Sequence, residues 1–354
     1  MKKILIVLAV LGLFLTGCSS SDKETLRVFN WGEYIDEDVI RAFEKQYNAR
    51  VIYNLFDSNE MMYTTLQSGE VFDVLIPSDY MIERLIAENK LQKLDFGKLS
   101  NFDGVMDHLL NLEFDPNQEY SAPYFWGNVG LVYNTNTVSE KDLEAGWEIL
   151  RNPTYAGRIY FYDSERDAFM IALKALGYSM NSTNEAEIQE AYEWLLDLDA
   201  NMNPIYVSDD VIDNMIAGIK DIAVMYSGDA TYVIEENEDL AYFVPEEGTN
   251  FWVDAMVIPS DALNVDLAHK FINFLLDADN AYANTYYVGY TTPVQSVFDE
   301  VTGEDGDYEG ADSYVPRMDY AFDEVFRHNE VVKKLLADLW FRVCLLYTSP
   351  SPRD

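Results

Sequence analysis

Short runs of β-forming residues alternate with helical patterns along most of this chain, and this alternation limits the folds it can adopt. From residue 25 the pattern predicts strands at 26–30, 51–55 and 72–76, separated by helices at 36–47 and 60–67. Strands separated by helices favour a parallel sheet with both faces covered. The sequence therefore predicts an α/β fold.

A second series of the same kind begins near residue 134. Its longest helix is predicted to open with a capping box formed by Ser182 and Glu185. Two such series in 354 residues indicate two α/β lobes with a cleft between them, where ligands gather at the carboxyl ends of strands. The predicted strands and helices of this series span residues 158–162, 167–176, 184–199, 222–226 and 251–258.

The N-terminal residues have the pattern of a secretion signal. Two lysines precede an apolar run at 4–15, which is too short to span a membrane. The run leads into the sequence Leu-Thr-Gly-Cys ending at Cys18, which resembles a bacterial lipobox. This resemblance implies a signal peptide at 1–17, lipid attachment at Cys18 and a short tether at 18–24.

The C-terminal residues show a break in composition. An amphipathic helix is predicted at 319–342, and residues 343–354 form an atypical tail that contains Cys344 and ends in serine and proline. We interpret this tail as a disordered end or a non-native addition. It enters no part of the predicted site.

The charge of the chain limits the class of partner. With 62 acidic and 24 basic residues, the formal net charge is −38. Such a surface repels phosphates, which argues against nucleic acid and in favour of a cationic partner. The two cysteines lie at opposite ends of the chain and cannot form a disulfide scaffold, so the fold must depend on packing.

Motifs of common enzyme and metal sites are missing from the sequence. It contains no Gly-x-Ser-x-Gly, no His-Glu-x-x-His and no glycine-rich phosphate loop. His108, His269 and His328 each lie beside charged residues in helical patterns and are interpreted as solvated surface residues. The acidic stretch at 305–310 resembles half of a calcium loop, but Pro316 stands where a bidentate Glu is required. We therefore predict no metal, no cofactor and no catalytic residue.

Aromatic residues and carboxylates occur together directly after predicted strands, at 31–34, 77–80 and 226–229, and again at 251–254 and 289–293. Carboxylates neutralise ammonium groups, and ring faces cover methylenes and attract cations. Such a set suits a flexible alkyl chain that carries ammonium groups. Because 14% of the residues are aromatic, most of them must nevertheless belong to the core.

Four segments, 29–35, 76–80, 250–254 and 289–293, resemble those of the spermidine/putrescine-binding component of bacterial polyamine ABC transporters. The likeness covers nearly all of residues 25–340. It implies a type II periplasmic-binding-protein fold, in which two discontinuous lobes close around a hinged cleft. The expected lobes comprise residues 25–133 with 255–300, and 134–254 with 301–342.

The same resemblance implies roles for individual residues. Asp254 and Asp167 are expected to pair with one terminal ammonium, and Glu33 with the far end of the ligand. Ser164 replaces the first acid of an acid-x-x-acid segment of the family. The expected ligand-binding residues are Trp31, Gly32, Glu33, Tyr34, Ser78, Tyr80, Asp167, Ser208, Tyr226, Trp252, Asp254 and Tyr290.

Together these features predict an extracytoplasmic, lipid-anchored binding protein, and not an enzyme. It would capture spermidine or putrescine and deliver it to the membrane permease of an ABC importer. Two alternatives stay open: a secreted glycosidase with paired carboxylates among sugar-stacking aromatics, and a receptor of the same fold for another organic cation such as thiamine. The sequence does not rank putrescine against spermidine.

Overall fold

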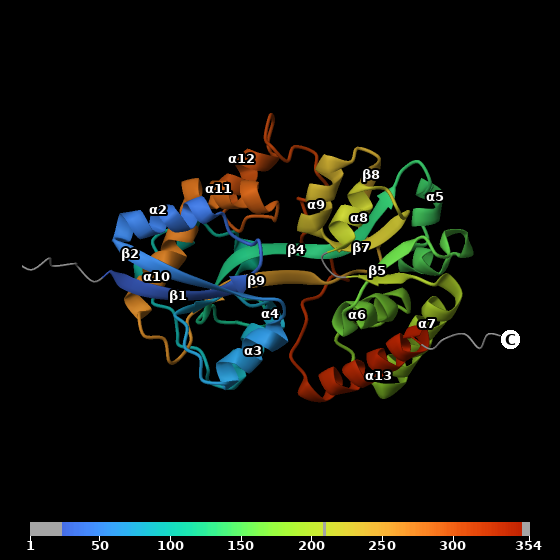
Figure 1. Ribbon diagram of the computed structural model, residues 1–354, viewed down its shortest axis with the longest axis horizontal. Coiled ribbons are helices and arrows are strands. Elements are labelled where there is room, and N and C mark those ends of the chain that lie inside the picture. The colour runs from blue at the N-terminus through green and yellow to red at the C-terminus, as the bar shows by residue number, and fades with distance from the viewer. Residues whose placement is uncertain (1–22, 208–209, 349–354) are drawn as a thin grey trace, which may run out of the picture.

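The computed structural model describes residues 23–207 and 210–348. The predicted signal peptide, the lipidation residue Cys18, most of the tether and the predicted ligand residue Ser208 lie outside the described residues, as do residues 349–354 of the tail. Figure 1 shows two lobes side by side, each with strands covered by helices. The predicted α/β class and the two lobes are confirmed.

Most predicted elements are present with small changes of boundary, although the strand predicted at 72–76 is reduced to two residues. The strands are β1 (Glu24–Trp31), β2 (Ala49–Phe56), β3 (Val74–Leu75), β4 (Ser121–Asn134), β5 (Ile159–Tyr162), β6 (Ile205–Val207), β7 (Ile222–Tyr226), β8 (Leu240–Phe243) and β9 (Phe251–Val257). The helices are α2 (Glu37–Tyr47), α3 (Asn59–Gln67), α4 (Asp79–Ala87), α5 (Glu140–Leu143), α6 (Glu165–Ala175), α7 (Glu185–Met202), α8 (Val211–Ile216), α9 (Ser227–Glu236), α10 (Val265–Leu275), α11 (Ala278–Val288), α12 (Gln295–Thr302) and α13 (Glu330–Thr348).

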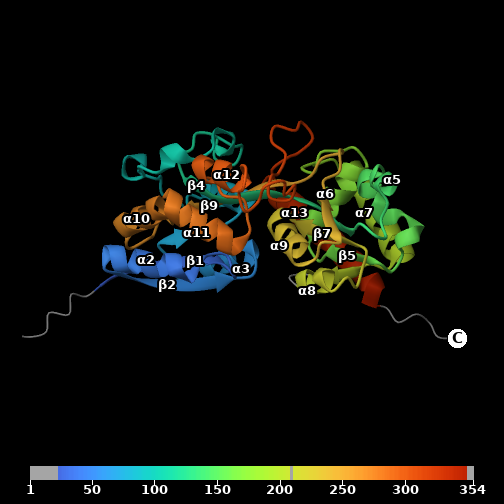
Figure 2. The same cartoon turned by 90° about the horizontal axis from the view of Figure 1, so that it is seen from above.

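The strands form one sheet that runs through both lobes in the order β2-β1-β3-β9-β4-β7-β5-β6, with β8 paired to β4. β1 is parallel to β2 and β3, and β5 is parallel to β6 and β7, whereas β4 is antiparallel to its neighbours. The first part of β4 pairs with β9, and its last part pairs with β7 and β8. β4 and β9 therefore join the lobes through the sheet itself (Figure 2). The exact lobe boundaries given above stay a prediction.

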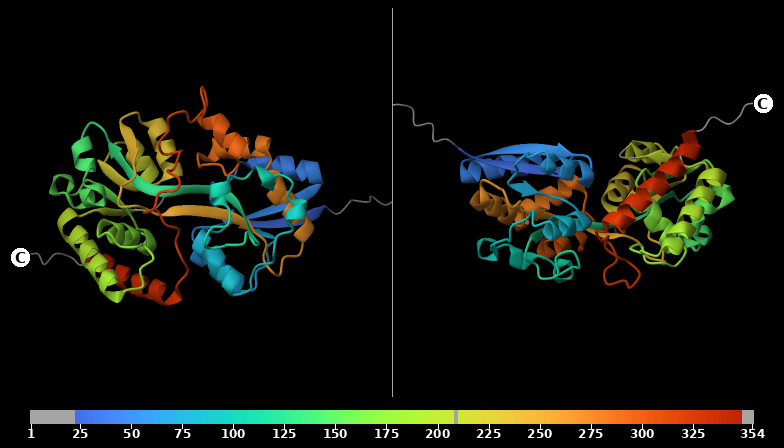
Figure 3. Two further views of the ribbon diagram at one scale, coloured as in Figure 1. Left: turned by 180° about the vertical axis from the view of Figure 1, so that it is seen from behind. Right: turned by 90° about the horizontal axis from the view of Figure 1, so that it is seen from below.

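A third link between the lobes is the connecting segment, residues 303–329, which leads from α12 to α13 (Figure 3). α13 packs on α6 and α7. The ammonium of Lys174 in α6 binds the carboxylate of Glu324 and the carbonyl oxygen of Phe322, the latter at 2.7 Å. The end of the connecting segment is thus fixed to the second lobe beside α6.

The N-terminus of α7 differs from the prediction. Asn184 is the N-cap, and its side-chain oxygen accepts a hydrogen bond from the backbone N–H of Ala186 at 3.0 Å. The hydroxyl of Ser182 instead donates to the carboxylate of Glu187 at 2.5 Å. The predicted capping box of Ser182 and Glu185 is wrong because Asn184, directly before the helix, takes the capping role.

The C-terminal helix begins and ends later than predicted. α13 starts at Glu330 because the side-chain oxygen of Asn329 accepts hydrogen bonds, each of 3.1 Å, from the backbone N–H groups two and three residues later. Residues 319–329 of the predicted helix belong to the connecting segment. α13 continues to Thr348, and Val343 is fully buried, so the first residues of the supposed tail pack against the fold.

The interpretation of the histidines as solvated residues is wrong for His269. This residue of α10 is 2% exposed, and its Nε2 accepts a hydrogen bond from the backbone N–H of Asp95 at 2.9 Å. Its Nδ1 lies 2.7 Å from the carbonyl oxygen of Val265. His108 is partly buried and lies against Trp126, with ring centroids 4.8 Å apart. The charged residues beside His269 and His108 in the sequence did not indicate that the fold would bury these side chains.

Candidate functional site

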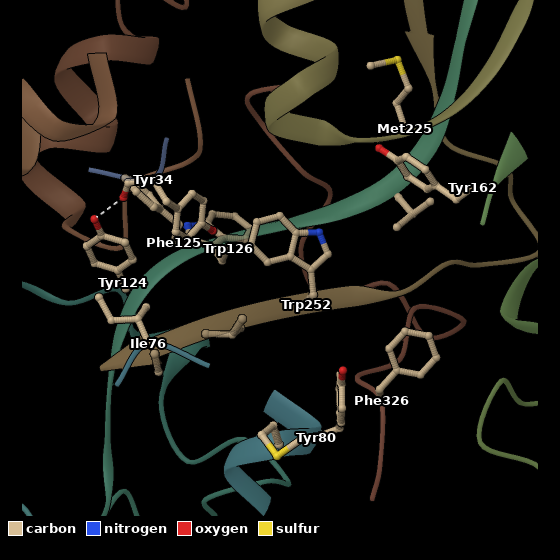
Figure 4. Close-up of a cluster of buried hydrophobic side chains, with 14 of the residues drawn as sticks. Tyr34, Ile76, Tyr80, Tyr124, Phe125, Trp126, Tyr162, Met225, Trp252 and Phe326 are labelled. Carbon is tan, nitrogen blue, oxygen red and sulfur yellow. Dashed lines mark hydrogen bonds between the residues drawn. The ribbon is translucent and has the colours of Figure 1, made fainter. Parts of the chain in front are cut away.

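The predicted site lies where the two lobes meet at β4 and β9. Tyr34 follows the end of β1, Tyr226 ends β7, and Trp252 and Asp254 belong to β9. Figure 4 shows Trp252 with Tyr34 on one side and Tyr162 on the other. Residues that are as far as 220 positions apart in the chain are thus brought together by the shared sheet.

Asp254 supplies a buried carboxylate to this region. Its residue is 6% exposed, and its Oδ2 accepts a hydrogen bond from the Tyr34 hydroxyl at 2.8 Å. Its Oδ1 has no hydrogen-bond partner among the described residues. Burial raises the pKa of the Asp254 carboxyl to about 6, against the lowering effect of the neighbouring hydroxyls of Ser78 and Tyr34. A buried carboxylate oxygen without a donor is suited to a ligand that carries N–H groups.

Aromatic rings from both lobes surround Trp252. Its ring centroid lies 5.5 Å from that of Tyr290 and 6.2 Å from that of Tyr226. Tyr290 in turn contacts Tyr34 edge to face, with centroids 5.3 Å apart. The indole N–H of Trp252 is buried and has no hydrogen-bond acceptor among the described residues. These rings offer faces for methylene groups and cations, with a polar donor among them.

Asp167 supplies a carboxylate from the second lobe. It lies in the first turn of α6 and is 3% exposed, and its Oδ2 accepts a hydrogen bond from the Tyr226 hydroxyl at 2.9 Å. Burial raises the pKa of Asp167, and hydrogen bonds to Ser164 and Tyr226 oppose that effect. The Ser164 hydroxyl accepts a hydrogen bond from the backbone N–H of Asp167 and caps the helix, so the residue in place of the family's first acid has a structural partner.

Asp229 is a further carboxylate in the same region. The Tyr290 hydroxyl donates to its Oδ1 at 2.7 Å, and the Tyr162 hydroxyl lies 3.4 Å from its Oδ2. Tyr162 also stacks on Tyr226, with centroids 4.9 Å apart. Sequence reasoning placed Asp229 in a strand-end group but did not count it or Tyr162 among the site residues. The same strand-end pattern could have found both, because Tyr162 ends β5 and Asp229 follows β7 by three residues.

Two glycines permit the close packing of these rings. A Cβ at Gly228 would lie 2.2 Å from the ring of Tyr290, and one at Gly127 would lie 2.6 Å from the ring of Trp252. Both distances are far below van der Waals contact, so a side chain at either position would displace an aromatic residue of the site. Glycine is therefore required here by the approach of the rings.

Ser78 and Tyr80 lie together at the N-terminus of α4. The side-chain amide of Asn59 donates to the Ser78 hydroxyl at 3.1 Å and to the Tyr80 hydroxyl at 3.0 Å. The guanidinium carbon of Arg166, from the second lobe, lies 3.6 Å from the Tyr80 ring centroid. Phe326 of the connecting segment contacts the same ring, with centroids 6.3 Å apart (Figure 4). Neither Arg166 nor Phe326 was expected to contact the site residues.

The first predicted binding loop is only partly joined to this group. Gly32 and Glu33 are exposed, and Glu33 has a positive φ of 50°. The Glu33 side chain makes no hydrogen bond or ion pair with the described residues. Trp31 is half-buried and contacts Phe56, and its indole N–H has no acceptor among the described residues. The role of Glu33 at the far end of a ligand stays a prediction.

Metal groups and membrane-spanning helices were sought in the part of the chain that the structure describes. Its His, Cys, Asp and Glu side chains form no group of three or more that could hold a metal ion. Over the same residues, no helix combines the length and apolarity needed to cross a bilayer. The chemistry of the site is that of carboxylates and aromatic rings.

Comparisons with known proteins agree with this chemistry. The family model described as bacterial extracellular solute-binding protein matches residues 38–308. A spermidine/putrescine-binding periplasmic protein of Salmonella typhimurium is 34% identical over 82% of this chain and 83% of its own length. A putrescine-binding periplasmic protein of Escherichia coli is 29% identical over 84% of this chain and 86% of its own length.

A solved structure extends the comparison to the fold. The spermidine/putrescine ABC transporter substrate-binding protein of Streptococcus pneumoniae superposes with a TM-score of 0.80 at 35% identity, covering 92% of this chain and 100% of that one. The expected two-lobed type II periplasmic-binding-protein fold is thereby confirmed. The chain belongs to the family of bacterial extracellular solute-binding proteins.

Proposed function

We propose that this protein binds a polyamine, spermidine or putrescine, and delivers it to an ABC importer. The observation that supports this most directly is the buried Oδ1 of Asp254, which has no hydrogen-bond donor among the described residues. Asp254 shares β9 with Trp252, whose ring contacts Tyr226 and Tyr290. The names of the similar proteins from Salmonella typhimurium and Streptococcus pneumoniae point to the same ligand class.

The site provides the two kinds of contact that a protonated polyamine requires. One terminal ammonium donates to Asp254 and Asp167, which accept hydrogen bonds from the hydroxyls of Tyr34 and Tyr226. The rings of Trp252, Tyr226 and Tyr290 cover the methylene chain and attract its charges. Glu33 serves the far ammonium. Each of these hydrogen bonds is stronger than a neutral one because both the ammonium and the carboxylate are ionised, and burial of the carboxylates strengthens the attraction further.

Ligand binding stabilises the closed arrangement of the lobes. Asp254 lies in β9, which pairs with β3 and the first part of β4, and Tyr34 follows β1 in the same half of the sheet. Asp167 in α6 and Tyr226 in β7 belong to the other half. A ligand that contacts both sets binds the closed state more tightly than the open one and shifts the population toward it. Small-angle scattering is expected to show a smaller radius of gyration with spermidine than without it, and an unchanged radius would contradict closure.

The protein acts outside the cytoplasm, held to the membrane by lipid on Cys18, which remains after cleavage of the signal peptide. The lipobox sequence before Cys18 supports this proposal. Its partner in transport is the membrane permease of the importer. Substitution of Cys18 by alanine is expected to release the protein from the membrane fraction, and mass spectrometry of the wild-type protein is expected to show acyl chains at its N-terminus.

A panel of ligands tests the proposed function. Thermal unfolding is measured with putrescine, spermidine, spermine, thiamine and neutral oligosaccharides. Polyamines are expected to raise the unfolding temperature, and the tighter-binding polyamine is expected to raise it more at equal concentration. A rise with thiamine alone would favour the receptor for another cation, and a rise with oligosaccharides, followed by release of sugar, would favour the glycosidase. Calorimetry with Asp254→Asn is expected to show an affinity loss equivalent to about 2 to 5 kcal/mol.

A further inference from the structure

One carboxylate next to the proposed site is already bound by cations of the protein itself. Glu60 lies in α3, and its Oε2 is 3.5 Å from the hydroxyl of Tyr80. Its Oε1 forms an ion pair of 2.8 Å with the ammonium of Lys333 in α13 and lies 3.8 Å from the guanidinium of Arg166 in α6. Both cations come from the second lobe, and both are largely buried, with 18% and 14% of their side chains exposed.

These two cations remove Glu60 from the set of carboxylates that a ligand can use. Burial alone would raise the pKa of Glu60, but the hydrogen bond from Lys333 and the charges of Lys333 and Arg166 lower it. Glu60 is therefore ionised, and its charge is balanced within the protein. Arg166 also covers one face of the Tyr80 ring, at 3.6 Å from the centroid, where a ligand methylene or ammonium would otherwise pack.

A cavity lies beside this pair, and Arg166, Arg327 and Lys333 are part of its lining. This cavity of about 190 Å³ is lined by Arg166 and Phe326, which both contact the Tyr80 side of the site, and by Arg327 and Lys333. Glu165 is the one carboxylate in the lining that the structure describes. The acceptors of Arg327 are Glu83 and Glu113, at 2.6 and 2.7 Å, so these carboxylates are also occupied.

We propose that Arg166 and Lys333 are specificity-determining residues that reject a third ammonium group and make the site selective for diamines over triamines and tetraamines. An additional ammonium at this end would meet the fixed positive charges of Arg166 and Lys333, while Glu60 is already bound by both and Glu165 is the one other carboxylate of the described lining. A diamine avoids this end, because Asp254 and Glu33 can take its two charges. This inference rests on the proposed polyamine function and adds the length and charge of the ligand to it.

The test uses calorimetry of the full chain with putrescine and spermidine. Lys333→Met keeps the length and helix preference of the side chain but frees Glu60, so a third ammonium gains a partner. The affinity for spermidine relative to putrescine is expected to rise by about tenfold or more. Arg166→Met is expected to change this ratio in the same direction. In the double variant Lys333→Met with Glu60→Gln, the gain is expected to disappear.

The neighbouring Lys334→Met is the matched control, because Lys334 is 74% exposed and pairs with Glu330 instead. It removes the same charge from the same helix and is expected to leave the ratio unchanged. An unchanged ratio in both Lys333→Met and Arg166→Met, or an equal rise in Lys334→Met, would overturn the inference. Failure of the wild-type protein to bind either amine would instead contradict the proposed function.

Discussion

Replacing Asp254 by asparagine is expected to weaken polyamine binding while stabilising the ligand-free fold. In the unfolded chain this carboxyl has the ordinary pKa of 3.8, and in the folded protein burial raises it to about 6. A carboxyl pKa of about 6 instead of 3.8 means that ionised Asp254 costs the folded state about 3 kcal/mol. Asparagine has a similar shape and no charge, so it escapes this cost.

The effect has a defined dependence on pH. Because the pKa is higher in the folded state, the folded protein binds the additional proton between about pH 4 and pH 6, and its stability falls as the pH rises through this window. Below about pH 4 the carboxyl is protonated in both states and carries no such penalty. The stability advantage of Asp254→Asn is therefore expected to be small at acid pH and to reach its full size above about pH 6.

Urea unfolding of the ligand-free protein, followed by tryptophan fluorescence at several pH values, measures this difference. Asp73→Asn is the control, since Asp73 is 1% exposed but accepts hydrogen bonds from the backbone N–H groups of Arg27, Leu263 and Asn264. That variant is expected to lose about 1 to 3 kcal/mol because an amide cannot accept all three bonds equally well. Equal destabilisation of Asp254→Asn at every pH would refute the reasoning.

Four further outcomes are expected. The affinity for putrescine falls about tenfold per pH unit below pH 6, because a proton must leave Asp254 before an ammonium can pair with it. Calorimetry across this pH range measures the affinity, and a flat profile would contradict the prediction. Gly228→Ala displaces the Tyr290 ring, because the added Cβ would lie 2.2 Å from it. The variant is expected to lose about 1 to 3 kcal/mol of stability in thermal unfolding, and calorimetry is expected to show weaker polyamine binding. Lys174→Met leaves Glu324 without its cation and costs about 2 kcal/mol in urea unfolding, less than a fully buried pair because the Glu324 side chain stays 28% exposed. The association rate of spermidine, measured by stopped flow, falls on the order of tenfold as salt screens the net charge of −38.

The local pattern of the sequence was sufficient to predict most elements of the fold. The regular alternation of strands and helices placed β1, α2, β2 and β7 to within about two residues of their observed bounds. It failed where a competing side chain decides the start of a helix, as Asn184 does for α7 and Asn329 for α13. Each of these asparagines has polar neighbours in the sequence that could also cap a helix. The hydrogen bonds in the folded protein decide which of these residues is the cap.

The candidate site was predictable only in part, because its geometry depends on contacts between the lobes. The strand-end pattern identified Trp252, Tyr226 and Asp254, which the sheet brings together. It did not indicate that Arg166 reaches across to Tyr80, because the position of a long cation is set by its partners in the other lobe. The exposed position of Glu33 was equally invisible, since the pattern gives the place of a residue in the chain and not the direction of its side chain.

β4 has a consequence for how the molecule unfolds. Its first residues complete the sheet of one lobe and its last residues complete the sheet of the other. If either half is lost, the remaining half exposes an unpaired edge and the apolar side chains beneath it. Heat or denaturant is therefore expected to melt the protein in a single cooperative transition, and neither half of the chain expressed alone is expected to be a stable domain.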